Sequence, residues 1–246
     1  MSDLERLSRE WDELADADAL WAVLSAPDRK GGRWTVDEFL ASGEQEIGEQ
    51  LAHAQSAYGL PQRFERALDF GCGAGRLVHA LAGRFDDVVG VDVSPAMIER
   101  ARTLTEDTRN VTLVVNTKPE LDFESGTFDL VYTNLVLQHL PAPELIERYV
   151  RELVRITATG GIALLQAPDT IPLAYRLQPL RRGYDFLRRA GVPARALILR
   201  TPLQPMRMTP LPRARFEAAV RDAGGEVLGA TPDGAHGFRY AIAKPS

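Results

Sequence analysis

The sequence has little cysteine and no long apolar run. Cys72 is the one cysteine among 246 residues, which excludes an intramolecular disulfide framework and is typical of a reducing compartment. No apolar run approaches the roughly 20 residues that a membrane-spanning helix needs, and the first residues of the chain hold no apolar signal core. We therefore expect a cytoplasmic protein that does not insert into membranes.

The chain as a whole also lacks a net positive charge. Its formal net charge is −5, with 45% hydrophobic and 26% charged residues, which is typical of a globular enzyme and disfavours a broad nucleic-acid-binding surface. One segment departs from this balance, because residues 166–215 hold eight of the 16 prolines and ten arginines against two acidic residues. Its net charge of +8 leaves −13 for the rest of the chain, and such a basic segment attracts anions.

A glycine-rich turn follows an apolar strand at Ala67 to Phe70. Gly71, Gly73 and Gly75 let the backbone take positive φ and approach a ligand closely, and the helix that follows presents free N–H groups. Asp92 ends the next apolar strand 17 residues after Gly75, where a carboxylate can accept hydrogen bonds from both hydroxyls of a ribose. The pattern predicts a nucleotide-like ligand at the turn; a structural connection without a ligand is the alternative.

Short apolar strands alternate with helical segments from Arg66 to Gln166, as a doubly wound parallel α/β sheet requires. Helices are expected after the glycine turn, at Ser94 and near Pro143, and the first 60 residues also have helical spacing, with a capping box at 35–38. A C-terminal helix precedes two more strands that a short turn joins into an antiparallel pair. The strands are expected at 67–70, 88–91, 111–115, 128–133, 162–166, 226–229 and 238–243.

The pattern Asp69-x-Gly71-x-Gly73-x-Gly75 with Asp92 resembles the first two motifs of the class I S-adenosylmethionine-dependent methyltransferases. The resemblance covers residues 61–166 and 208–244. It includes Ser94-Pro95-Ala96-Met97-Ile98, Phe128-Asp129-Leu130-Val131, Gln138-His139-Leu140 and Thr159-Gly160-Gly161.

Two other functions are alternatives to methyl transfer from S-adenosylmethionine. A nicotinamide-dependent oxidoreductase is opposed by Arg76, which stands where a dinucleotide fingerprint needs glycine, and by the C-terminal antiparallel pair. A module that binds S-adenosylmethionine without turnover stays open, because His139 need not be catalytic.

The resemblance implies a single domain over residues 1–246 with a Rossmann-like, seven-stranded sheet whose C-terminal strand is antiparallel. Residues 1–60 would form a helical cap, 61–165 and 210–246 the core, and 166–209 an insertion over the active site. S-adenosyl-L-methionine is the implied cofactor. The residues expected to bind it are Asp69, Gly71, Cys72, Gly73, Gly75, Asp92, Val93, Met97, Asn116, Thr117, Asn134 and Leu135.

Some of these positions allow more than one interpretation. Many relatives have an acidic residue for the adenine amino group where this chain reads Asn116-Thr117, and the Asn116 amide oxygen can still accept that hydrogen bond. Cys72 is most simply a small residue in a tight turn. Three residues within the expected cap, Arg33, Trp34 and Phe39, either cover the cofactor or only pack against neighbouring side chains. Packing is the favoured interpretation.

His139 is the leading candidate for a catalytic general base. It lies six residues beyond the fourth strand, at the edge of the sheet where doubly wound folds bind ligands, and imidazole can accept a hydroxyl proton at neutral pH. A histidine that only shapes the pocket is the alternative. The other histidines, His53, His79 and His236, are expected to be structural.

The substrate class is narrowed by signatures that the sequence lacks. Thr133-Asn134-Leu135-Val136 stands where base-methylating enzymes carry a Pro-Pro-aromatic motif, and neither a paired-glutamate loop nor a carboxylate cluster for a metal is visible. We therefore expect no metal and no nucleic acid, but a small-molecule acceptor, with methyl transfer to a hydroxyl oxygen of a sugar, polyketide or similar metabolite. The arginine-rich segment, with Arg181 and Arg182, would be a mobile, irregular cover that recognises an anionic group, or else a solvated surface or a contact with an acidic face.

Overall fold

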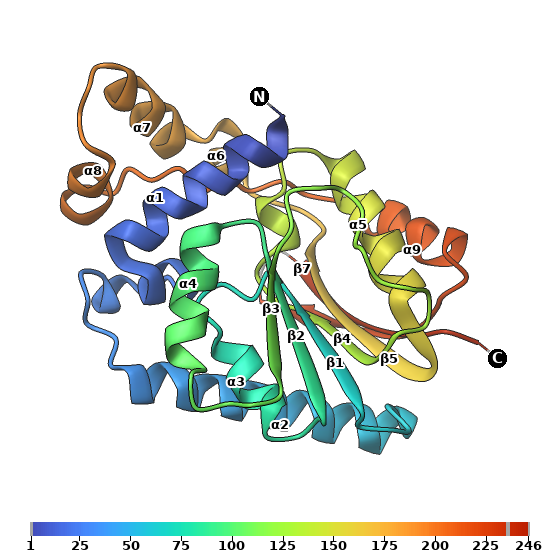
Figure 1. Ribbon diagram of the computed structural model, residues 1–246. Helices are drawn as coiled ribbons and strands as arrows, with labels where there is room; N and C mark the ends of the chain where they lie inside the picture. Colours follow the sequence, from blue (N-terminus) through green and yellow to red (C-terminus); the bar gives the residue numbers. More distant parts are fainter. Residues whose placement is uncertain (1, 235–236, 246) are drawn as a thin grey trace.

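The computed structural model describes residues 2–234 and 237–245, and within them a seven-stranded sheet forms the centre of the molecule (Figure 1). Strands β1 to β5 are parallel, and β7 runs antiparallel to both of its neighbours, β5 and β6. This confirms the predicted doubly wound α/β fold with an antiparallel C-terminal strand. In the order of the sheet, the strands are β3 (Val111–Val115), β2 (Asp87–Asp92), β1 (Arg66–Phe70), β4 (Phe128–Thr133), β5 (Thr157–Pro168), β7 (Gly237–Ala243) and β6 (Glu226–Asp233).

Two strands are longer than the sequence predicts. β5 begins at Thr157, which pairs with Phe128 across an irregular register. β6 continues past Gly229 to Asp233, opposite Gly237, because an edge strand tolerates the proline at position 232. His236, expected in the turn of this hairpin, lies outside the described residues.

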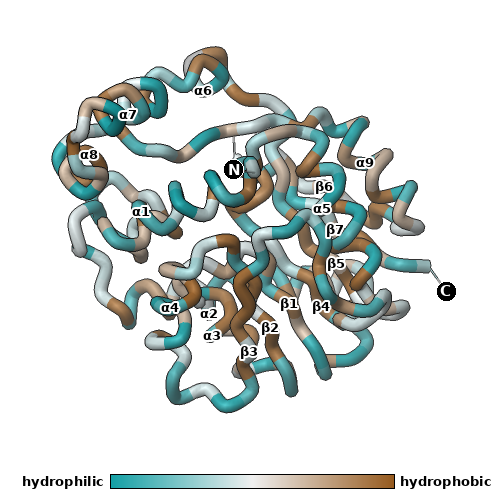
Figure 2. Tube along the Cα trace, turned by 45° about the horizontal axis from the view of Figure 1, so that its top comes forward, coloured by the Kyte–Doolittle hydropathy of each residue, from teal (hydrophilic) through white to brown (hydrophobic). Residues whose placement is uncertain are grey.

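Helices cover both faces of the sheet. On one face, α2 (Val36–Tyr58), α3 (Arg76–Ala82) and α4 (Pro95–Leu104) bury apolar side chains against β1, β2 and β4. On the other face, α5 (Pro143–Ile156) packs against β4 and β5, and α9 (Arg213–Asp222) packs against β6 and α5. The strands between the layers are strongly hydrophobic in Figure 2, as parallel strands buried on both faces must be. The carboxyl ends of the strands stay open for a ligand.

The N-terminal helix α1 (Asp3–Val23) lies across α4 and borders these carboxyl ends (Figure 1). Leu4, Leu7 and Leu14 are buried, as their spacing predicts. The predicted capping box of α2 is present, with the Thr35 hydroxyl accepting the N–H of Glu38 at 3.2 Å. A short 3-10 helix, η1 (Pro27–Arg29), connects α1 and α2.

Part of the segment after β5 is helical, so the expectation of irregular structure holds for only part of it. It contains α6 (Leu173–Leu177), α7 (Pro179–Arg189) and α8 (Ala194–Arg200), followed by an extended stretch, residues 201–209, that we call the strap. Its prolines start helices instead of preventing them: Pro172 and Pro193 are N-caps, and Pro179 is the first residue of α7. Proline suits the first turn because the N–H that it lacks has no partner there.

Candidate active site

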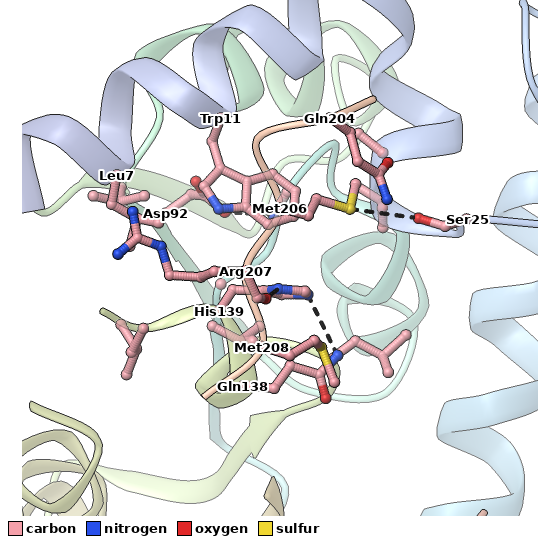
Figure 3. A pocket seen from close by; sticks show the side chains of 18 of the residues that line it. Leu7, Trp11, Ser25, Asp92, Gln138, His139, Gln204, Met206, Arg207 and Met208 are labelled. Atoms are coloured by element: carbon pink, nitrogen blue, oxygen red, sulfur yellow. Dashed lines mark hydrogen bonds between the residues drawn. The ribbon is translucent and has the colours of Figure 1, made fainter. Parts of the chain in front are cut away.

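A cavity of about 530 Å³ opens at the carboxyl ends of β1, β2 and β4. This is where doubly wound sheets bind ligands, and the volume suits a small molecule. Its floor comes from the glycine turn and the strand ends, and its roof from α1, α7 and the strap. Figure 3 shows Trp11 of α1 and Met206 and Arg207 of the strap gathered over His139.

The glycine turn has no room for side chains. Gly71, Gly73 and Gly75 have φ values of 78°, 52° and 88°, in the left-handed region. A Cβ at position 71 would lie 2.3 Å from Val136 Cγ2, and one at position 73 would lie 2.6 Å from Val23 Cγ2. The backbone of the turn therefore lies close to two side chains of the cavity wall, and the positive φ values that the sequence predicts for it are present.

Asp92 joins the turn to the cavity. One carboxylate oxygen accepts the N–H of Gly73 at 2.9 Å, and the other accepts the N–H of Ser94 at 2.8 Å. Burial raises the pKa of Asp92 to about 6, although these backbone hydrogen bonds oppose the shift. Each oxygen keeps a lone pair, so an ionised Asp92 can hold the turn and still accept from a hydroxyl in the cavity.

The expected cofactor residues divide into two groups. One group lines the cavity: Gly71, Gly73, Asp92, Val93, Asn116, Asn134 and Leu135. The other residues are not part of the wall: Asp69, Cys72, Gly75, Met97 and Thr117.

The side chains of the second group have other surroundings. Cys72 is buried beneath the turn, where burial raises the pKa of its thiol, in line with a small packing residue. Met97 is buried in the core between α1 and α4, and Thr117 is exposed. Direct contact of these side chains with a cofactor is therefore not supported by the geometry and stays a prediction.

A buried polar network positions Asn134. Glu46 of α2 pairs with Arg76 at 2.7 Å and accepts hydrogen bonds from the Tyr132 hydroxyl and the Asn134 amide, both at 2.7 Å. The Arg76 side chain is 4% exposed. Arg76 thus has a structural role where a dinucleotide-binding turn would carry glycine. Glu46 was missed from the sequence, since no local motif marks a partner on a distant helix.

Asp69 lies beside this network without a full set of partners. Burial raises its pKa to about 8, the nearby Glu46 and Asp92 carboxylates act in the same direction, and Arg76 opposes them. One oxygen, Oδ2, has no hydrogen-bond partner within the described residues. A protonated Asp69 at neutral pH follows from this environment.

The loops after β3 and β4 are held by their own side chains. Asn116 donates to the carbonyls of Lys118 and Glu120 at 2.9 and 3.2 Å and accepts the N–H of Lys118, so only part of its hydrogen-bonding capacity faces the cavity. Leu135 has a φ of 59°, and its N–H donates to Gln166 Oε1 at 3.1 Å. A left-handed residue other than glycine costs roughly 1–2 kcal/mol, and such strain is common at ligand sites.

His139 belongs to the 3-10 helix η2 (Leu137–His139) beyond β4. Its Nδ1 lies 2.7 Å from the Arg207 carbonyl oxygen, which can only accept, so Nδ1 carries the proton and Nε2 the lone pair. Nε2 is 3.3 Å from the Gln138 amide nitrogen, and the Trp11 ring meets the imidazole edge-on at 5.3 Å. Burial lowers the pKa of His139 to about 4, and the Arg207 cation acts in the same direction against an opposing hydrogen bond to the Arg207 carbonyl. His139 is therefore a neutral acceptor at pH 7.

Many arginines of the insertion bind acidic groups of the chain itself. Arg188 pairs with Glu13 at 2.6 Å, and Arg207 pairs with Glu10 at 2.8 Å. Arg181 also pairs with Glu10. Ion pairs with acidic residues of α1 thus account for the positive charge of these three arginines. The hypothesis that the whole basic segment binds an anion is therefore too broad. Arg182, expected to help bind an anion, is exposed and is not part of the cavity wall.

The other residues singled out from the sequence are outside the wall. Trp34 donates to the Leu24 carbonyl at 3.2 Å and packs against Phe39, which is fully buried, while Arg33 is exposed. The favoured packing interpretation fits Trp34 and Phe39, whereas the exposed Arg33 neither packs in the core nor lines the cavity. His53 contacts Tyr58, and His79 lies near Glu44 on the surface, in line with structural roles.

Comparison with known proteins gives the class of this domain. A family model described as a methyltransferase domain matches residues 67–161. Trans-aconitate 2-methyltransferase of Methylobacterium radiotolerans is 34% identical over 43% of this chain and 38% of its own length. Malonyl-[acyl-carrier protein] O-methyltransferase of Legionella pneumophila is 32% identical over 54% and 46%. The chain spans about half or less of the length of these curated relatives.

A solved structure extends the similarity in fold to nearly the whole chain. Magnesium protoporphyrin IX methyltransferase from Synechocystis PCC 6803, with bound S-adenosylmethionine, superimposes with a TM-score of 0.62 at 15% identity, over 99% of this chain and 98% of that one. The match of the methyltransferase-domain model to residues 67–161 and the shared fold support the predicted class I S-adenosylmethionine-dependent methyltransferase superfamily. S-adenosylmethionine is the cofactor of this superfamily.

Two findings concern the described part of the chain alone. None of its helices is long and apolar enough to cross a membrane. Nor does it contain a group of three or more His, Cys, Asp or Glu side chains arranged to hold a metal ion.

Proposed function

We propose that the protein transfers the methyl group of S-adenosylmethionine to an oxygen atom of a small-molecule acceptor, most simply a hydroxyl of a sugar, polyketide or similar metabolite. The observation that carries this proposal is the shared cavity, which Asp92 and the glycine turn line on one side and His139 on the other. The names of relatives, which include O-methyltransferases acting on small or carrier-bound acids, support the reaction class.

The cofactor residues follow from the cavity wall. Asp92 would accept the ribose hydroxyls, and the amino-acid end would lie over the backbone of Gly71 to Gly75, whose glycines leave room for it. The N–H groups of Gly71, Gly73 and Gly75 donate to Val91, Asp92 and Cys72 and hold the turn in shape. Asn116 would bind the adenine, and Leu135 with Asn134 would complete the wall. When bound, S-adenosylmethionine supplies an electrophilic methyl group on its sulfonium.

His139 would act on the acceptor. Once the acceptor hydroxyl replaces the Gln138 amide as the partner of Nε2, that nitrogen would take the hydroxyl proton and the ring would become an imidazolium. The methylated oxygen would remain on the acceptor, and S-adenosylhomocysteine would be the second product. The Arg207 carbonyl keeps the imidazole in the required tautomer and stabilises the imidazolium through Nδ1–H. Trp11 and the strap roof the site and exclude water, so that positioning supplies most of the rate.

We also propose that the whole chain works as one unit, with residues 1–60 as a cap and 166–209 as an insertion over the core. Both regions support this by contributing to the roof of the cavity. No nucleic acid is needed as a partner.

Incubation with S-adenosylmethionine and a panel of hydroxyl-bearing acceptors, with S-adenosylhomocysteine as the readout, tests the function. The proposal expects acceptor-dependent product. Binding of S-adenosylhomocysteine by calorimetry without turnover on any acceptor would identify a non-catalytic binding module. Binding of NADH in place of S-adenosylhomocysteine would revive the oxidoreductase alternative.

A further inference from the structure

Arg207 is a buried cation in the cavity wall with unused hydrogen-bonding capacity. Its side chain is 7% exposed. One terminal nitrogen, Nη2, donates to both oxygens of Glu10, at 3.1 and 2.8 Å. Its Nε–H has no partner within the described residues. A buried donor left without an acceptor costs about 1–3 kcal/mol, so this position favours a further acceptor.

The charge around Arg207 is also incomplete. Glu10 is shared between Arg207 and Arg181, and all three side chains are nearly buried, at 13%, 7% and 14% exposure. Arg181 has a second carboxylate in Asp185 at 3.3 Å, but that side chain is 37% exposed and screened by solvent. The buried cluster therefore holds two guanidinium groups and one carboxylate. The next two acids on α1 have other partners: Asp12 accepts hydrogen bonds from Ser94 and Ala96, and Glu13 binds Arg188 and the Tyr184 hydroxyl.

The position of Arg207 links this charge to the predicted chemistry. Its carbonyl accepts the Nδ1–H of His139, so the guanidinium and the proposed base are connected through one residue of the strap. Asp92, the acidic side chain on the cofactor side of the cavity, approaches Gly73 and Ser94 instead. An anion would thus find its partner on the acceptor side of the cavity.

We infer that Arg207 binds an anionic group of the methyl acceptor, of the size of a carboxylate or phosphate, with Glu10 holding the guanidinium in place. The inference rests on the proposed function and names its substrate class. Guanidinium forks bind such groups through parallel hydrogen bonds, and burial strengthens the interaction far beyond that of an exposed arginine such as Arg182.

Binding of an anionic acceptor at Arg207 would also change the basicity of His139. The Arg207 cation disfavours a charged His139. An anionic group bound beside Arg207 offsets that cation, which raises the pKa of the imidazole and makes Nε2 a stronger base once the acceptor has arrived.

Calorimetry on the protein saturated with S-adenosylhomocysteine tests the inference. The probes are trans-aconitate, 4-hydroxybenzoate and phenyl phosphate, each compared with its uncharged methyl ester or phenol. At least one anion is expected to bind at least tenfold more tightly than its uncharged counterpart. Arg207→Gln should weaken that binding by about 10- to 100-fold, Arg207→Lys should restore part of it, and the exposed control Arg182→Gln should leave it unchanged.

The variant Glu10→Gln distinguishes anion binding by Arg207 from a purely structural role of the Arg207–Glu10 ion pair. Glutamine keeps an amide oxygen that can accept from Arg207 Nη2 and hold the guanidinium, but it removes the shared negative charge. Anion binding should therefore become tighter, whereas a purely structural role predicts loss in both variants. Absence of anion binding to the loaded wild-type protein, equal effects of Arg182→Gln and Arg207→Gln, or weaker binding in folded Glu10→Gln would overturn the inference. Failure of the proposed function would be visible separately, as the absence of acceptor-dependent S-adenosylhomocysteine formation by the wild-type protein.

Discussion

His139 offers a sharp test of the chemistry, because its surroundings determine both which nitrogen is free and when the ring is charged. The pKa of about 4 means that only about 1% of the side chain is protonated at pH 6. A histidine with its ordinary pKa of about 6.5 would be roughly three-quarters protonated there. Lowering the pH from 8 to 6 should therefore leave the reaction nearly unchanged, instead of slowing it about fourfold, and the loss of activity should come as the pH falls through about 4.

The assay is kcat/KM for the acceptor at saturating S-adenosylmethionine, followed by product formation between pH 4 and 8. His139→Gln should lower turnover by roughly 10²- to 10⁴-fold and abolish this acid limb, while cofactor affinity measured by calorimetry stays nearly intact. His53→Gln is the matched control, since that histidine is remote from the cavity. An acid limb near pH 6.5 in the wild-type protein would refute the buried neutral imidazole, and more than half of the activity in His139→Gln would remove it from the mechanism.

Three further predictions concern the cofactor side of the cavity. Asp92→Ala should weaken S-adenosylmethionine binding by about 1.5–3 kcal/mol, and wild-type affinity should fall as the pH drops through about 6, where Asp92 takes up a proton; unchanged affinity in a folded variant would contradict its role. Gly71→Ala should lose cofactor binding in calorimetry, because the new Cβ would collide with Val136. Adding Val136→Ala to this variant should recover only part of the binding, since the positive φ at position 71 remains. Full recovery would mean that the backbone conformation does not constrain this position. Asp69 keeps its proton in the folded state up to about pH 8, so its contribution to the free energy of unfolding falls as the pH rises from about 4 to 8. Urea unfolding of Asp69→Asn should therefore show a gain over wild type that is larger at pH 8 than at pH 5, and an equal difference at both would be inconsistent with a raised pKa.

Features that depend on neighbouring residues could be read from the sequence. Apolar runs and glycines located the strands and the turn, and Asp92 followed from its place at a strand end. The helices of the insertion are not evident from the sequence, because a high proline content is typical of irregular structure, whereas Pro179 here begins α7 and Pro172 and Pro193 are N-caps.

Features that depend on pairing through space could not be read in this way. The charge of the insertion was evident, but nothing local indicates that Arg207 meets Glu10, or that Glu46 holds Asn134. The sequence therefore indicates only that some part of the basic segment attracts anions, whereas the structure allows us to propose one buried side chain, Arg207. The depressed pKa of His139 likewise arises from burial under a helix and a strap that are remote in the chain.

The roof of the cavity has a consequence for how the protein is made. Glu10 and its partner Arg207 are 197 residues apart, and ribosomes add roughly 5–20 residues per second. Helix α1 therefore leaves the ribosome about 10 to 40 seconds before the strap that completes the roof. During that interval the β1–β4 half of the sheet can form, while Leu7, Trp11 and Glu10 lack the strap that covers them. The nascent chain can thus form its glycine turn early, and the roof over the cavity only near the end of synthesis.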